Sequence, residues 1–137
     1  MRIIIDTNLW ISFIISKKFN QIETLFLKNE VVLIFNEELI LEIKNTMSKP
    51  KLMKYFNENS LNEMLVAFEE CIEIIASYTS IKICRDEKDN FLLNLSIDGN
   101  ADYLITGDKD LLVLNQIEKT KIITITEFTE IITKNKH

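Results

Sequence analysis

The sequence predicts an α/β fold with three layers, in which helices cover both faces of a twisted, mostly parallel sheet of about five strands. Three observations support this prediction. Short apolar runs of Ile, Val and Leu recur without polar alternation, which is typical of strands that are covered on both faces. Helical patterns separate these runs. The connections are short, and the chain contains only two Gly and one Pro.

The strands are predicted from four apolar runs and a weaker fifth run. Each is short enough for a buried strand and is followed by polar or turn-forming residues. The four clear runs are Arg2–Ile5, Val31–Ile34, Tyr103–Thr106 and Lys121–Ile125, and the weaker one is Ser80–Cys84.

The helices between these strands are predicted from apolar spacing and from capping residues. The clearest pattern covers Ser60–Ala76, where apolar residues recur on one face and Ser60 with Glu63 forms a capping box. The other expected helices contain Leu9–Ile15, run from an Asn36 cap to about Met47, run from an Asp86 cap through Glu87–Ile97, and run from a Thr126 cap to about Thr133.

Length and composition indicate one globular domain, residues 1–137, with a core large enough to fold without a disulfide or a metal. The first residues form too short an apolar run for a signal peptide, and no run is long enough to span a membrane. We therefore expect a cytoplasmic protein. The only His is terminal, and Cys71 and Cys84 lack zinc-ligand spacing, so we expect core thiols, although a bridge between them stays open.

Two acids follow predicted strands at the edge of the sheet where ligands of parallel sheets bind. Asp6 comes directly after Arg2–Ile5, and it is also a candidate cap for the next helix. Asp108 lies two residues past the strand that ends at Thr106, in a segment that also suits a turn. Because Thr106, Asp108 and Asp110 occur together after a buried strand, a functional edge is the favoured interpretation.

Two further acids lie on predicted helices. Asp89 is in the first turn of the helix that Asp86 caps, so Asp89 remains available for another role or simply favours the helix dipole. Glu42 lies on the flank of the apolar face of its helix, where it is either a surface residue or a side chain that reaches over the sheet edge.

A cluster of such acids needs a counter-charge. Carboxylates about 5 Å apart repel one another by roughly 3 kcal/mol per pair at an effective dielectric of about 20. Hard divalent cations prefer oxygen ligands, and Mg²⁺ takes carboxylates together with water and phosphate. The acids therefore indicate a Mg²⁺ or Mn²⁺ site that suits phosphodiester hydrolysis.

The residues resemble the PIN (PilT N-terminus) domain family, in particular the small prokaryotic toxins of toxin–antitoxin pairs. The resemblance covers nearly the whole chain. It is carried by Asp6-Thr7-Asn8, by Glu42 and, most specifically, by Arg85–Asn90 and Ala101–Leu111.

The resemblance implies a metal-dependent endoribonuclease that cleaves single-stranded RNA with Mg²⁺ or Mn²⁺. Asp6, Glu42, Asp89 and Asp108 would form the acidic quartet that holds the metal, with Asn8, Thr106, Asp110 and Asp86 in supporting roles. Asp86 and Asp89 compete for one place, and Asp89 is favoured because Asp86 suits the cap. A toxin of this kind would have a cognate antitoxin protein as its partner.

Other functions fit less well. A receiver domain would need an acidic pair after the first strand, and an aspartate-nucleophile phosphatase would need a second Asp where Asn8 stands. A stronger alternative is a non-catalytic module of the same fold that binds RNA or protein. The net charge of −5 argues against a passive nucleic-acid binder and requires local basic groups to hold RNA, for which candidates are Lys17, Lys18, Lys49, Lys51, Lys54 and Lys109. Trp10 and Leu41 are candidate exposed residues for a partner or a homodimer, although an ordinary core or surface position is the favoured interpretation of both.

Overall fold

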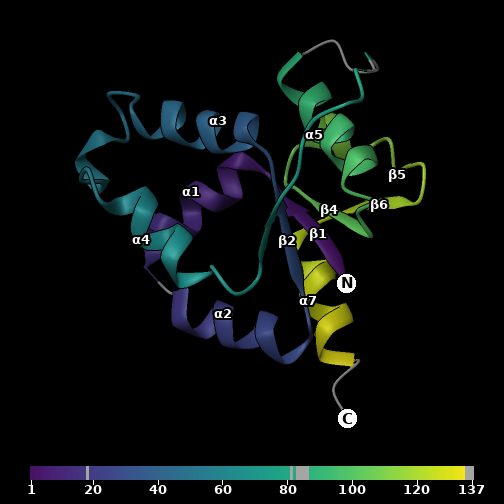
Figure 1. The fold of residues 1–137 in the computed structure, drawn as a ribbon, viewed down its shortest axis with the longest axis horizontal. Coiled ribbons are helices and arrows are strands. Elements are labelled where there is room, and N and C mark those ends of the chain that lie inside the picture. The colour runs from purple at the N-terminus through teal and green to yellow at the C-terminus, as the bar shows by residue number, and fades with distance from the viewer. Residues whose placement is uncertain (18, 81, 83–86, 135–137) are drawn as a thin grey trace.

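Figure 1 shows the computed structural model, which describes residues 1–17, 19–80, 82 and 87–134. Strands and helices alternate along most of the chain. In order they are β1 (Arg2–Ile5), α1 (Thr7–Ser16), α2 (Phe19–Lys28), β2 (Val32–Phe35), α3 (Glu37–Met47), the 3₁₀ helix η1 (Met53–Tyr55), α4 (Ser60–Ala67), β3 (Ile72–Ile74), α5 (Glu87–Asp98), β4 (Tyr103–Ile105), α6 (Lys109–Leu112), β5 (Gln116–Ile117), β6 (Thr120–Ile123) and α7 (Ile125–Lys134).

The described strands form one six-stranded sheet in the order β3-β2-β1-β4-β6-β5. Every neighbouring pair is parallel except β5 and β6. The first strand therefore lies in the interior, between β2 and β4, where both of its neighbours run in its own direction. This confirms the predicted α/β class and the mostly parallel sheet, and it places the carboxyl ends of β1 and β4 side by side.

The helices cover the sheet in layers. Figure 1 shows α1 to α4 on one side of the central strands and α5 on the other. Ring contacts connect the first layer with the sheet. The ring centroid of Trp10 in α1 lies 5.3 Å from that of Phe35 in β2 and 5.5 Å from that of Phe68, which follows α4. Trp10 is only 1% exposed. Trp10 is therefore an ordinary core residue, and its candidacy for a partner surface was wrong, whereas Leu41 is 55% exposed.

The predicted helix over Ser60–Ala76 is only half correct. The helix ends at Ala67, and Ile72–Ile74 forms β3, which pairs in parallel with β2 from Leu33 opposite Ile72. The backbone groups at the outer edge of β2 gain hydrogen bonds from this pairing, and this long-range gain overrides the local helical pattern. The capping box is also absent, since Ser60 is already inside the helix and its hydroxyl accepts from the Asn57 N–H at 3.0 Å.

Other boundaries agree more closely. Asn36 caps α3 as predicted, with its side-chain oxygen accepting from the Leu39 N–H at 2.8 Å. The last strand ends at Ile123, and Thr124 rather than Thr126 caps α7, through reciprocal hydrogen bonds with Glu127 at 3.1–3.2 Å. The second helix, α2, was not predicted.

Two expectations fall wholly or partly outside the described residues. Of the weak strand Ser80–Cys84, only Ser80 and Lys82 are described, and neither is in a strand. Cys71 is buried, while Cys84 is not described, so their proximity is untested. No helix in the described ranges is both long and apolar enough to cross a membrane.

Candidate metal centre

Asp6 lies where β1 meets α1, and its carboxylate has two structural partners. One oxygen accepts from the Leu9 N–H at 2.9 Å and so caps α1, while the other accepts from the Thr106 hydroxyl. The side chain is 6% exposed. Burial raises the pKa of Asp6, and the hydrogen bonds from Thr106 and Leu9 oppose this rise. The cap and the position at the sheet edge therefore coexist in one residue.

Thr106 connects Asp6 with the next acid along the sheet edge. Its side chain is fully buried, and its oxygen accepts from the Asp108 N–H at 3.0 Å while its hydroxyl donates to Asp6. Asp108 then caps the short helix α6 by accepting from the Asp110 N–H at 2.9 Å. These hydrogen bonds connect the Asp6 carboxylate with the backbone of Asp108, and the supporting role of Thr106 stays a prediction.

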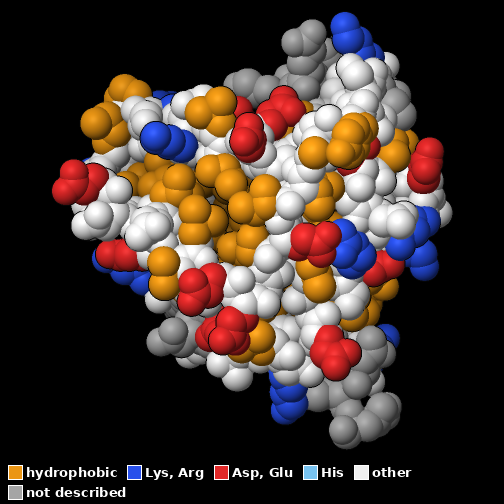
Figure 2. Space-filling view, viewed as in Figure 1, with side chains coloured by type: hydrophobic (Ala, Val, Ile, Leu, Met, Phe, Trp, Pro, Cys, Tyr) orange, Lys and Arg blue, Asp and Glu red, His pale blue; other side chains and the backbone are white. Residues whose placement is uncertain are grey.

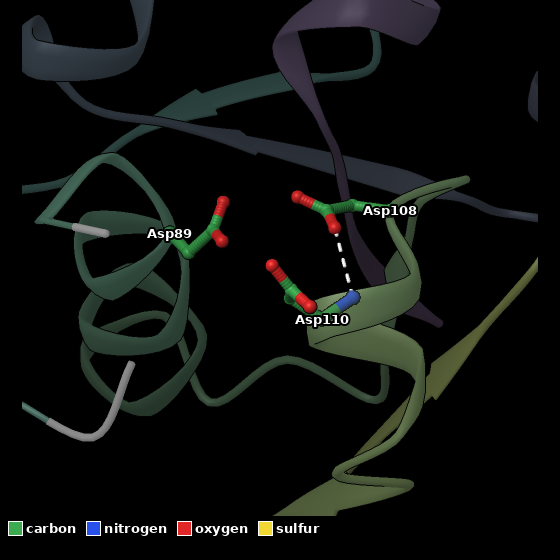
Figure 3. Close-up of side chains that lie close together, drawn as sticks. All are labelled: Asp89, Asp108 and Asp110. Carbon is green, nitrogen blue, oxygen red and sulfur yellow. Dashed lines mark hydrogen bonds between the residues drawn. The ribbon is translucent and has the colours of Figure 1, made fainter. Parts of the chain in front are cut away.

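Three carboxylates meet above this network. Asp89 from α5 points toward Asp108 and Asp110 of the α6 turn, as Figure 3 shows. Each of the three offers an oxygen within 4.8 Å of the others. Asp89 is only 9% exposed, while Asp110 is exposed to solvent. We name these three residues the acidic triad.

The predicted quartet shares one cleft. Asp6, Glu42, Asp89 and Asp108 all line a cavity of about 180 Å³ at the carboxyl ends of β1 and β4, together with Asn8. Glu42 reaches this cleft because α3 packs against α1, whose first turn carries Asn8. The remaining lining residues are Thr7, Thr46, Lys49, Phe91, Leu92 and Leu111.

The triad and the quartet overlap without being identical. Asp89 and Asp108 belong to both, whereas Asp110, expected in a supporting role, replaces Asp6 and Glu42 in the tight group. Sequence reasoning gave no weight to Thr46, a buried residue whose hydroxyl donates to the Glu42 carbonyl at 2.8 Å. The signal that could have found Thr46 is its spacing of four residues from Glu42, which puts both side chains on the same face of α3. Asp86 lies outside the described residues.

The triad has the chemistry of a hard-cation site. At 4.8 Å, the upper limit of the separation between these oxygens, two negative charges repel by about 3 kcal/mol at an effective dielectric of about 20. Solvent reduces this repulsion most at the exposed Asp110. The donors are all oxygens, and no His or Cys belongs to the group. Carboxylate oxygens at this spacing suit Mg²⁺ or Mn²⁺ and offer little to Zn²⁺, so the residues fit a divalent ion of the first kind.

A larger cavity lies away from these acids. It measures about 630 Å³ and is lined mainly by apolar side chains of α3, η1 and α4, among them Ile40, Met47, Phe56 and Leu61. Figure 2 shows it as an apolar hollow in the face formed by these helices. Size alone would make it the first candidate for a binding site, but it lacks a group of acids or other reactive side chains. The smaller acidic cleft is therefore the candidate for chemistry.

Comparison with known proteins places this cleft in a family. A family model described as PIN domain matches residues 2–110, which include all three acids of the triad. An uncharacterized protein of Methanocaldococcus jannaschii is 35% identical over 122 residues, covering 87% of this chain and 78% of the relative. PIN domains are generally nucleases that use divalent metals. On this evidence, the chain belongs to the PIN domain family.

Proposed function

We propose that this protein is a divalent-metal-dependent endoribonuclease that cleaves single-stranded RNA. The observation that carries the proposal is the acidic triad of this PIN domain, in which each carboxylate offers an oxygen within 4.8 Å of the others, and two of the three, Asp89 and Asp108, line the acidic cleft. Carboxylates this close repel one another unless a cation neutralises them, and PIN-domain nucleases generally use divalent cations.

The residues divide the work of the site. Asp89, Asp108 and Asp110 would hold Mg²⁺ or Mn²⁺, with Asp6 and Glu42 on the walls of the same cleft. A divalent ion bound there supplies positive charge to the phosphodiester and lowers the pKa of water. Thr106 holds Asp6 and Asp108 in position through its two hydrogen bonds. Asn8, exposed beside them, is placed to orient water or the sugar–phosphate chain.

The test is cleavage of a labelled single-stranded RNA by the purified chain with Mg²⁺, Mn²⁺ or EDTA. We expect cleavage with either metal, none in EDTA, and a loss of at least about a hundredfold in Asp89→Asn and Asp108→Asn. Glu130→Gln is the matched control, because it removes one acid from the exposed face of α7. Cleavage that persists in EDTA, or in a variant that carries both Asp89→Asn and Asp108→Asn, would contradict the mechanism.

A metal titration separates the catalytic proposal from its alternative. If Mn²⁺ binds and RNA binds but no strand is cut, the chain is a non-catalytic module of the same fold. If neither binds, the acidic triad has only a structural role.

We further propose that the protein is the toxin of a toxin–antitoxin pair and acts in the cytoplasm. The resemblance to small prokaryotic PIN toxins supports this role. Expression of the chain in a bacterium should arrest growth, Asp108→Asn should relieve the arrest, and a protein encoded beside it should bind the chain and restore growth. Harmless expression of an active nuclease would contradict the toxin role and leave the nuclease proposal intact.

A further inference from the structure

One basic side chain lines the acidic cleft. Among the described residues around it, Lys49 carries the one positive charge, and four acids line the same cleft, namely Asp6, Glu42, Asp89 and Asp108. The other described lysines considered for RNA binding, Lys17, Lys51, Lys54 and Lys109, do not line this cleft. The structure therefore separates Lys49 from the other candidates by position.

The backbone of Lys49 is anchored beside the cleft. Its N–H donates to the Thr46 carbonyl at 3.2 Å, and its carbonyl accepts from the N–H groups of Leu52 at 2.9 Å and Met53 at 3.1 Å. These bonds tie it to the turn between α3 and η1. The side chain itself is exposed, so its ammonium group can move within the reach that this anchor allows.

The ammonium group of Lys49 is not consumed by the acids around it. In the described part of the chain, the recorded ion pairs are Arg2–Glu73 and Lys119–Asp102, and neither involves Lys49. An ammonium group that lines an acidic cleft and forms no ion pair with its carboxylates can bind an anion that enters the cleft. A phosphodiester is the anion that the proposed reaction brings into this cleft.

The net negative charge of the cleft also favours a role for the Lys49 ammonium group in binding a phosphate. At their formal charges, the four acids of the cleft, Asp110 and one divalent cation leave a charge of −3, which repels a phosphodiester, and Lys49 reduces it to −2. The acidic balance of the whole chain, −5, offers no general attraction that would replace this local charge.

We propose that Lys49 binds a backbone phosphate of the single-stranded RNA in the acidic cleft. This rests on the nuclease function proposed above and adds the residue that holds the substrate against a negatively charged site. A phosphate contact made equally before and during the reaction lowers KM and leaves kcat nearly unchanged.

The variants are chosen to separate this contact from a structural role. Lys49→Ala removes the side chain, Lys49→Gln removes the charge at similar length, and Lys49→Arg keeps the charge. Lys44→Ala is the matched control, because Lys44 is the basic residue in the last turn of α3, shortly before Lys49 in the chain, and lines the apolar cavity instead. It reports what loss of a positive charge near this helix end does by itself.

Steady-state cleavage of a short labelled RNA in Mn²⁺ gives the first measurement. We expect Lys49→Ala and Lys49→Gln to raise KM about tenfold with kcat changed by less than about threefold, as for loss of one charged hydrogen bond. Lys49→Arg should restore KM to within about threefold of the parent, and Lys44→Ala should leave it unchanged. The apparent Mn²⁺ affinity should stay equal or rise in Lys49→Ala, since a positive charge beside the site is lost.

Binding of the same RNA at several salt concentrations gives the second measurement, in an Asp108→Asn background that prevents cleavage. One phosphate contact fewer should reduce the slope of log Kd against log salt by about 0.7. A structural defect would not change this slope selectively. A parent that cleaves RNA while Lys49→Ala matches Lys44→Ala in KM and in slope would overturn the Lys49 proposal alone. A parent that binds RNA without cleaving it would overturn the nuclease proposal while the slope still tests Lys49, and a parent that does neither would overturn both.

Discussion

Replacement of Thr106 by Val tests the hydrogen bonds that hold the two strand-end acids. Valine has nearly the shape of threonine but no hydroxyl, and Thr106 is fully buried where β4 ends. The change deprives the Asp6 carboxylate of a donor and the Asp108 N–H of its acceptor, while it leaves the packing volume almost unchanged.

The expected cost follows from these two bonds. A hydrogen bond to a charged group contributes about 1.5–3 kcal/mol, and an unsatisfied, partly buried N–H costs about 1 kcal/mol. Together they give a loss of roughly 3 kcal/mol. For a chain of 137 residues this corresponds to a fall in Tm of about 10 °C. The apparent Mn²⁺ affinity should fall by about tenfold to a hundredfold, because the Asp6 carboxylate loses a hydrogen-bond donor and the backbone that carries Asp108 loses its anchor.

Urea unfolding in EDTA measures the stability without a contribution from bound metal. Thr106→Ser is the control, since it keeps the hydroxyl and loses one methyl group, at a cost of about 1 kcal/mol. If Thr106→Val proves as stable as Thr106→Ser and binds Mn²⁺ as well, the hydrogen bonds of Thr106 hold nothing in place and the reasoning fails.

Three further predictions concern other parts of the molecule. Asp110→Asn should weaken Mn²⁺ binding by about tenfold in a calorimetric titration, because Asp110 is one of the three acids whose oxygens lie within 4.8 Å of one another. An unchanged affinity would mean that Asp89 and Asp108 bind the ion without Asp110. Gly99→Ala should lower the free energy of unfolding, measured in urea, by about 1–3 kcal/mol. The added Cβ would lie 2.9 Å from the Ile34 side chain and 3.0 Å from the Leu95 carbonyl oxygen. An unchanged free energy would mean that the Ile34 side chain moves aside without cost. Burial by itself would raise the pKa of Asp98, but hydrogen bonds from Thr79 and Tyr78 lower it below 3.8, so ionised Asp98 stabilises the fold above that pH and loses this effect as the pH falls through the lowered pKa. Asp98→Asn should therefore cost about 1–2 kcal/mol at pH 7 and progressively less below pH 3.8, and a cost independent of pH would contradict this account.

The sequence by itself was sufficient for the class of fold and for the edge of the sheet that carries the site. Continuous apolar runs such as Arg2–Ile5 require cover on both faces, which only a sheet between helices provides. Asp6 and Asp108 could be chosen from their places after strands, because the carboxyl ends of parallel strands share one edge. These are local signals, read from a few neighbouring residues.

The tertiary structure decided what depends on contacts between distant segments. Ile72–Ile74 reads as the end of a helix, and only the free edge of β2 makes it a strand. The sequence leaves Trp10 open between core and surface, and the packing of Phe35 and Phe68 around it decides for the core.

The acidic cleft shows the same division. The sequence supplied the acids, but helix geometry alone only permitted Glu42 to face them, and the packing of α3 on α1 brought it to the cleft. The place of Asp110 beside Asp89, and of Lys49 in the same cleft as the acids, follows from how α5 and the turn after α3 meet the sheet edge. Side chains far apart in the chain meet only through packing, so no local pattern could have ranked Asp110 above Asp6 or Lys49 above the other lysines.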